Sequence, residues 1–201
     1  MNIKRVNSYD DKRFKLDVLK QHGAYLIDNK PYEIEITAND EAIIRGENKE
    51  YFKELIEEFR FNAPQITTFK DIVGNIIINY PKVKLLKLNI KEIQPSQFYI
   101  DHDKLDAVSS FINSEKDIVI QVMPYKEGYI SLDGHTRLYY AFLKGYKEIY
   151  AVESESDDYI FRFVDEAIRR NIKCISDMEL IKHDEYEIKW NAYCDEVFKN
   201  S

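Results

Sequence analysis

The feature that most constrains the fold is a strand-like segment that leads through a glycine turn into a helix-like segment. Residues 128–131 are strand-like, residues 132–137 read Leu-Asp-Gly-His-Thr-Arg, and residues 138–144 are helix-like. A further strand-like segment, 149–152, follows. The N-terminus of a helix offers free backbone N–H groups and the positive end of the helix dipole. Residues 133–137, which we call the 133–137 turn, are therefore predicted to bind an anion, most naturally a phosphate.

The side chains of this turn suit a phosphate site. Arg137 keeps its charge and can bind a phosphate through two hydrogen bonds, and Thr136 adds a hydroxyl donor. His135 can donate to a phosphate oxygen or move a proton near neutral pH, while Asp133 can coordinate a divalent ion or accept a proton. A purely structural turn is the alternative, with Asp133 as helix cap and Gly134 at a positive φ.

Composition narrows the class of protein. Hydrophobic residues make up 44% of the 201 residues, enough for the core of one medium domain or two small ones. The 29 basic and 36 acidic residues leave a net charge of −7. Because neutralisation of phosphates drives most non-specific binding to nucleic acid, this balance argues against such a partner.

The sequence gives no support for a zinc site, a membrane span or secretion. Cys174 and Cys194 form no Cys-x-x-Cys pair and have no neighbouring histidine, so no zinc site is predicted. The chain contains no apolar run long enough to span a membrane and no secretory signal pattern. We therefore expect a cytoplasmic protein with no membrane partner.

The periodicity predicts three parts. Residues 1–84 form a small α+β unit, residues 85–153 a second α+β domain that contains the 133–137 turn, and residues 154–201 a C-terminal helical extension. In the first part we predict a helix at 11–22, strands at 24–28, 32–37, 41–45, 67–70 and 76–80, and a helix at 49–61. In the other two we predict strands at 85–90 and 118–125, a turn at 93–97, and helices at 104–112, 159–171 and 184–198.

The order of elements over about residues 85–153 resembles the ParB/sulfiredoxin superfamily. The resemblance depends on Ile93-Gln94-Pro95-Ser96-Gln97 and on the Asp-Gly-His-Thr-Arg sequence of the 133–137 turn. It implies an α+β fold with a mixed sheet and helices, in which the glycine turn and the following helix hold the phosphates of ATP, ADP or CTP. Members of the superfamily include chromosome-partitioning CTPases, sulfinic-acid reductases and free-serine kinases.

The residues of the turn distinguish this chain from some of these members. Sulfiredoxins carry a reactive cysteine where this chain has Gly134, which argues against reductase chemistry. ParB proteins carry Gly-Glu-Arg-Arg and a helix-turn-helix domain, whereas this chain has Gly-His-Thr-Arg and an acidic, aromatic-rich C-terminal part. The serine kinases, with Asp-Gly-His-His-Arg, are nearest.

The kinase members also place a catalytic glutamate shortly after the proline that corresponds to Pro95. This chain has Gln97 there, and a glutamine cannot take a proton from a hydroxyl at neutral pH. Asp101 or Asp103 are candidates for the missing carboxylate. The alternative is that Asp101-His102-Asp103 is an exposed loop that caps helix 104–112.

The leading prediction is a protein that binds the phosphates of ATP or ADP with Mg²⁺, and that acts as a phosphotransferase on a small hydroxyl-bearing molecule. The predicted catalytic residues are Asp133, His135 and Asp101. The predicted nucleotide-binding residues are Gly134, His135, Thr136, Arg137 and Gln97, and Asp133 is the predicted Mg²⁺ ligand. A non-catalytic regulatory or interaction module is one alternative, and a DNA-binding or nuclease-type protein is another.

Overall fold

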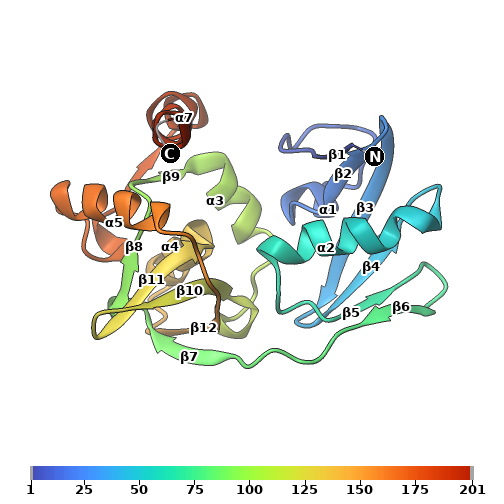
Figure 1. The fold of residues 1–201 in the computed structure, drawn as a ribbon, viewed down its shortest axis with the longest axis horizontal. Coiled ribbons are helices and arrows are strands. Elements are labelled where there is room, and N and C mark those ends of the chain that lie inside the picture. Colours follow the sequence, from blue (N-terminus) through green and yellow to red (C-terminus); the bar gives the residue numbers. More distant parts are fainter. Residues whose placement is uncertain (1, 200–201) are drawn as a thin grey trace. The chain divides into compact units, whose positions relative to one another are not determined.

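The structure is a computed structural model that describes residues 2–199. The chain divides into two compact units, one up to Lys84 and one from Leu85 onward (Figure 1). Both units combine sheets with helices, which confirms the predicted α+β class. No helix in residues 2–199 has the length and apolar character needed to cross a membrane.

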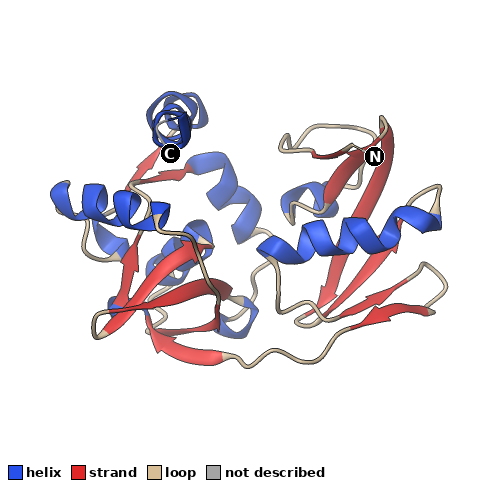
Figure 2. Ribbon diagram, in the orientation of Figure 1, coloured by secondary structure: helices blue, strands red, loops and turns tan. Residues whose placement is uncertain are grey.

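The first unit is a sheet with strands in the order β1-β2-β3-β4-β5-β6. Neighbouring strands are antiparallel except β4 and β5, which are parallel and are joined by the crossover helix α2. Helix α2 lies across the strands of this sheet (Figure 2). Its apolar side chains are buried in the core of this unit. The elements are β1 Ile3–Arg5, α1 Leu16–Lys20, β2 Ala24–Ile27, β3 Lys30–Ala38, β4 Glu41–Arg45, α2 Phe52–Asn62, β5 Thr68–Lys70 and β6 Ile76–Asn79.

The second unit has a mixed sheet in the order β7-β12-β10-β11-β8. Strands β10 and β11 form an antiparallel hairpin, and each has a parallel neighbour, β12 and β8 respectively. The strands are β7 Leu86–Asn89, β8 Ile93–Pro95, β10 Val119–Tyr125, β11 Gly128–Asp133 and β12 Glu148–Glu153. The helices are α3 His102–Ser109, α4 His135–Leu143, α5 Tyr159–Arg169, α6 His183–Tyr186 and α7 Ala192–Lys199, with a π-helical turn Glu187–Asn191 between the last two.

The C-terminal segment shares the core of the second unit. Ala167, Ile175 and Met178 belong to the same buried cluster as Ile120 of β10 and Leu138 of α4. Strand β9 (Tyr99–Asp101) also pairs in parallel with β13 (Glu179–Ile181). Residues 154–199 are therefore part of this unit, and the pairing of β13 places the start of α6 next to the end of β9.

Several local predictions were wrong. Residues 93–97 were predicted as a turn, but Ile93–Pro95 is the edge strand β8, where Pro95 at the strand end is tolerated. The helix predicted at 11–22 is limited to Leu16–Lys20. The helix predicted at 104–112 begins at His102, because the carboxylate of Asp101 accepts a hydrogen bond from the Asp103 N–H and caps it.

Candidate functional site

The 133–137 turn connects β11 to α4 through a glycine in a left-handed conformation. Gly134 has a φ of +85° and is the N-cap of α4, so Asp133 does not have the capping position of the structural alternative. A Cβ at position 134 would lie 2.7 Å from Cγ2 of Ile120, which leaves no room for another residue. The first intrahelical bond runs from the Leu138 N–H to the Gly134 carbonyl. The preceding N–H groups of the first turn therefore lie at the helix N-terminus, as an anion site requires.

A cation and a carboxylate lie beside this helix start. The Arg137 guanidinium donates to Oδ2 of Asp133 at 3.0 Å. The Arg137 side chain is 21% exposed and that of Asp133 47%, so both remain accessible to a small ligand. The pair uses one carboxylate oxygen and part of the guanidinium fork, so either group can exchange its partner for a ligand.

His135 is buried and connects the turn to the segment after β8. The Ser96 N–H donates to its Nε2 at 3.2 Å, and the Ser96 hydroxyl donates to the Ser131 carbonyl at 2.7 Å. Burial lowers the pKa of His135 to about 4. At neutral pH the ring is uncharged with its proton on Nδ1. The positive charge at the turn therefore comes from Arg137 and the helix dipole, and the catalytic role of His135 stays a prediction.

Gln97 and Lys104 reach the hydroxyl of the buried Tyr186, and Asp101 pairs with His183 of the same helix. We call Gln97, Asp101, Lys104, His183 and Tyr186 the Tyr186 cluster. Gln97 Nε2 donates to the Tyr99 carbonyl at 2.6 Å and to Tyr186 Oη at 2.8 Å. Lys104 Nζ lies 3.4 Å from the same Oη. Burial raises the pKa of Tyr186, and the charges of Asp101 and Asp133 raise it further. Tyr186 is therefore a neutral phenol within electrostatic reach of both carboxylates.

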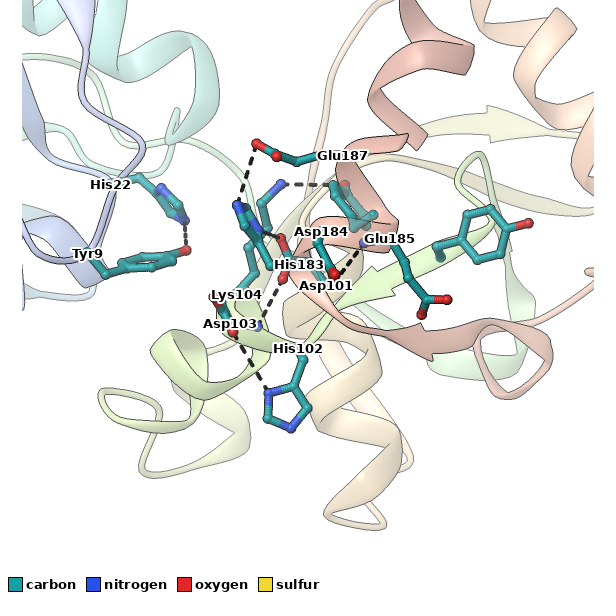
Figure 3. Close-up of polar contacts among 12 residues, drawn as sticks. Tyr9, His22, Asp101, His102, Asp103, Lys104, His183, Asp184, Glu185 and Glu187 are labelled. Carbon is teal, nitrogen blue, oxygen red and sulfur yellow. Dashed lines mark hydrogen bonds and ion pairs between the residues drawn. The ribbon is translucent and has the colours of Figure 1, made fainter. Parts of the chain in front are cut away.

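Another contact of the cluster joins Asp101 to His183 (Figure 3). His183 Nδ1 lies 2.8 Å from Oδ2 of Asp101, whose side chain is fully buried, while the His183 side chain is 48% exposed. The parallel pairing of β9 with β13 sets Ile181 opposite Asp101, and His183 follows two residues later. The hydrogen bond to Asp101 raises the pKa of His183. The prediction of an exposed loop at 101–103 was therefore wrong for Asp101, although its capping role is confirmed.

Three predicted site residues affect Tyr186, one by direct contact and two through their charges. Gln97 touches its hydroxyl, and the charges of Asp101 and Asp133 act on it. Helix α4, which begins at the turn, packs against β9 and α3, and α6 packs against β9. The sequence analysis did not predict Lys104, His183 or Tyr186 as site residues. The one sequence signal near His183 was the short β-like segment that precedes it. This segment could not point to Asp101, because its partner strand β9 is distant in sequence.

A divalent cation at the turn would have Asp133 as a single carboxylate ligand. No group of three or more His, Cys, Asp or Glu side chains within residues 2–199 is placed to hold a metal ion. Magnesium that accompanies a nucleotide binds through phosphate oxygens, water and one or two carboxylates. The half-exposed Asp133 therefore fits a cation that arrives with the nucleotide.

Comparison with known proteins gives no family assignment. No protein-family model matches the chain, and no curated protein matches it. Among solved structures, the chain is similar to the crystal structure of protein Atu1540 from Agrobacterium tumefaciens, with 14% identity and a TM-score of 0.34. That match covers 48% of this chain and 61% of the other, so it spans less than two thirds of the other protein's length. A likeness of this size carries no argument, and the ParB/sulfiredoxin resemblance stays a prediction from the sequence.

Proposed function

We propose that the second unit is a ParB/sulfiredoxin-type nucleotide-binding domain that holds the phosphates of ATP or ADP at the 133–137 turn. We further propose that it transfers a phosphoryl group to a small hydroxyl-bearing molecule. The observation that carries the proposal is the left-handed Gly134, which starts α4 next to the accessible Arg137–Asp133 pair. This arrangement supplies backbone donors, a helix dipole and a guanidinium within one turn of chain.

The Arg137–Asp133 ion pair suggests how the ligand is accommodated. A phosphate that takes Arg137 as its partner releases the Asp133 carboxylate. That carboxylate is then available to Mg²⁺, which when bound offsets the charge of the phosphates. Thr136, partly exposed in the first turn of α4, is the further hydroxyl donor. Binding thus exchanges one protein–protein ion pair for two protein–ligand contacts.

A non-catalytic nucleotide-binding module is the second candidate. Gln97 stands where the kinase members have their catalytic acid, and its amide is fixed between the Tyr99 carbonyl and Tyr186. This observation favours a binding role, because Gln97 supplies no base. Release or transfer of phosphate distinguishes the enzyme from the module, and a gel-shift assay with DNA tests the nuclease-type alternative.

Replacement of Arg137 by Ala is expected to weaken nucleotide binding by about 10- to 100-fold. The loss corresponds to roughly 1.5–3 kcal/mol for hydrogen bonds to a charged group. Isothermal titration calorimetry with ATP, ADP and CTP, each with Mg²⁺, measures it. Arg137→Lys keeps the charge but loses the planar fork, so an intermediate affinity is expected.

Arg169→Ala is the matched control for this titration. Arg169 is an exposed arginine of α5 that also pairs with a carboxylate, Glu166. Its removal should leave the nucleotide affinity unchanged. The proposal is wrong if the wild-type protein binds none of the nucleotides, or if both arginine variants lose affinity equally.

A further inference from the structure

The Asp101–His183 pair has the geometry of a base and its orienting carboxylate. The Nδ1–H of His183 donates to Asp101, which leaves Nε2 as the acceptor nitrogen of the neutral ring. Asp101 is fixed on its other side, because its Oδ1 accepts the Asp103 N–H. The buried carboxylate of Asp101 thus accepts two hydrogen bonds and fixes one edge of the half-exposed imidazole.

A chain of hydrogen bonds connects the element of this pair to the proposed phosphate site. The Ser96 N–H donates to His135 of the turn, and the next residue, Gln97, donates to Tyr186. Asp101 ends β9, which packs against α4, the helix that starts at the 133–137 turn. Tyr186 follows His183 by one helical turn in α6, and the charge of Asp133 helps to raise its pKa. The carboxamide of Gln97, which reaches Tyr186, supplies no base here. Among the residues of the Tyr186 cluster, His183 is the group suited to accept a proton at neutral pH.

We propose that His183, oriented by Asp101, is the general base that activates the acceptor hydroxyl of the phosphoryl transfer. This inference rests on the proposed function and names the base that the sequence did not provide. In the step, the acceptor O–H bond breaks and its proton passes to His183 Nε2. A new O–P bond forms to the terminal phosphate of the nucleotide, and the bond from that phosphorus to the bridging oxygen breaks. The shortened nucleotide leaves with the electron pair of that bond, and His183 later returns its proton to water.

The charges around His183 favour its protonated form. Asp101 lies on β9, Asp103 on α3, and Glu187 follows α6, with its Oε1 3.6 Å from Nε2. The hydrogen bond to Asp101 and the charges of Asp101, Glu187 and Asp103 raise the pKa of His183, and burial opposes them. A raised pKa makes the imidazole a stronger base and extends its protonated form to higher pH. The rate should therefore rise with pH until His183 has lost its proton.

A purely structural pair is the competing explanation, since the same contact also fastens α6 to β9. A structural role predicts changes in stability and none in the pH dependence of the rate. His102 provides a matched control. It is also an exposed histidine in acidic surroundings, 3.4 Å from Asp106, but among residues 2–199 it forms no ion pair with a buried carboxylate.

The experiment measures nucleotide affinity and phosphate release separately, with ATP–Mg²⁺ as the nucleotide and water as the acceptor. His183→Gln should lower the rate of phosphate release by about 100-fold or more and leave the ATP affinity within about twofold. His102→Gln should change neither quantity. Asp101→Asn, which keeps the shape of the side chain but lowers the basicity of His183, should shift the acid limb of the rate profile to lower pH and reduce its plateau.

The outcomes separate the two proposals. Absence of nucleotide binding by the wild-type protein overturns the proposed function, and the base assignment with it. Binding without phosphate release, or with release that His183→Gln leaves unchanged, overturns the base assignment alone. If His183→Gln does not fold, the Asp101→Asn profile decides, and a profile that superimposes on the wild type rejects the base.

Discussion

The free energy of unfolding of the second unit is expected to fall by roughly 3 kcal/mol as the pH is lowered from about 6.5 to 4 because His135 cannot take up a proton in the folded state. Burial lowers the pKa of His135 from 6.5 to about 4. Between these values the unfolded chain binds a proton that the folded chain does not. The contribution of the neutral His135 to the free energy of unfolding is fully present above pH 6.5 and is lost as the pH falls from 6.5 to 4.

Urea unfolding at several pH values measures this effect through tryptophan fluorescence. The chain has 1 tryptophan, Trp190, and it packs against the core of the second unit. His135→Gln is the comparison, since glutamine can still accept from the Ser96 N–H but does not titrate. The stability of this variant should lose the steep fall between pH 6.5 and 4. An equal fall in both proteins would contradict the assignment to His135.

Other titrating groups of the second unit affect the measurement in known directions. His183 has a raised pKa, so its contribution is present below pH 6.5 and is lost as the pH rises through its folded pKa. This is the opposite sign to His135. Hydrogen bonds from Arg169 lower the pKa of Glu166 to about 2, so its contribution disappears mainly below pH 4.5. The difference between wild type and His135→Gln removes both contributions.

The parts of the fold that were predicted from the sequence are those with a local cause. The strand predicted at 41–45 is Glu41–Arg45, and the helix predicted at 159–171 is Tyr159–Arg169, because each has a clear apolar period. Strand β8 has three residues, one of them proline, and is a strand only because β11 lies beside it. Short segments of this kind have no periodicity to recognise, so their structure depends on a partner.

The residues of the candidate site also fall into those with a local sequence signal and those that depend on a distant partner. Gly134 and Arg137 lie within one turn of chain, so the order of strand, glycine and helix was enough to predict their place at the start of α4. Asp101 and His183 are 82 residues apart, and Gln97 and Tyr186 are 89 apart. No local pattern brings these side chains together; the parallel pairing of β9 with β13 does so. A lone histidine after a three-residue strand carries no signal of that pairing.

Gly134→Ala is expected to destabilise the second unit by about 2–5 kcal/mol. A left-handed φ costs an alanine about 1–2 kcal/mol, and a methyl group forced into a packed core costs a further 1–3 kcal/mol or so. The φ of Gly134 is +85°, and its added Cβ would lie 2.7 Å from Cγ2 of Ile120 and 3.1 Å from Nε of Arg137. Because the same methyl group displaces Arg137, nucleotide affinity should fall as well.

Gly145→Ala separates the two causes of this loss. Gly145 also has a positive φ, +73°, but a Cβ there meets no atom within 4 Å, so its replacement should cost only the conformational part. An Ile120→Ala background removes the 2.7 Å contact but keeps Cβ of residue 120 at 3.0 Å, so Gly134→Ala should then cost less than in the wild type and still more than Gly145→Ala. Urea unfolding of the single and double variants gives this coupling energy. Equal losses for the two glycine replacements in the wild-type background would show that the close packing against Ile120 does not constrain the turn.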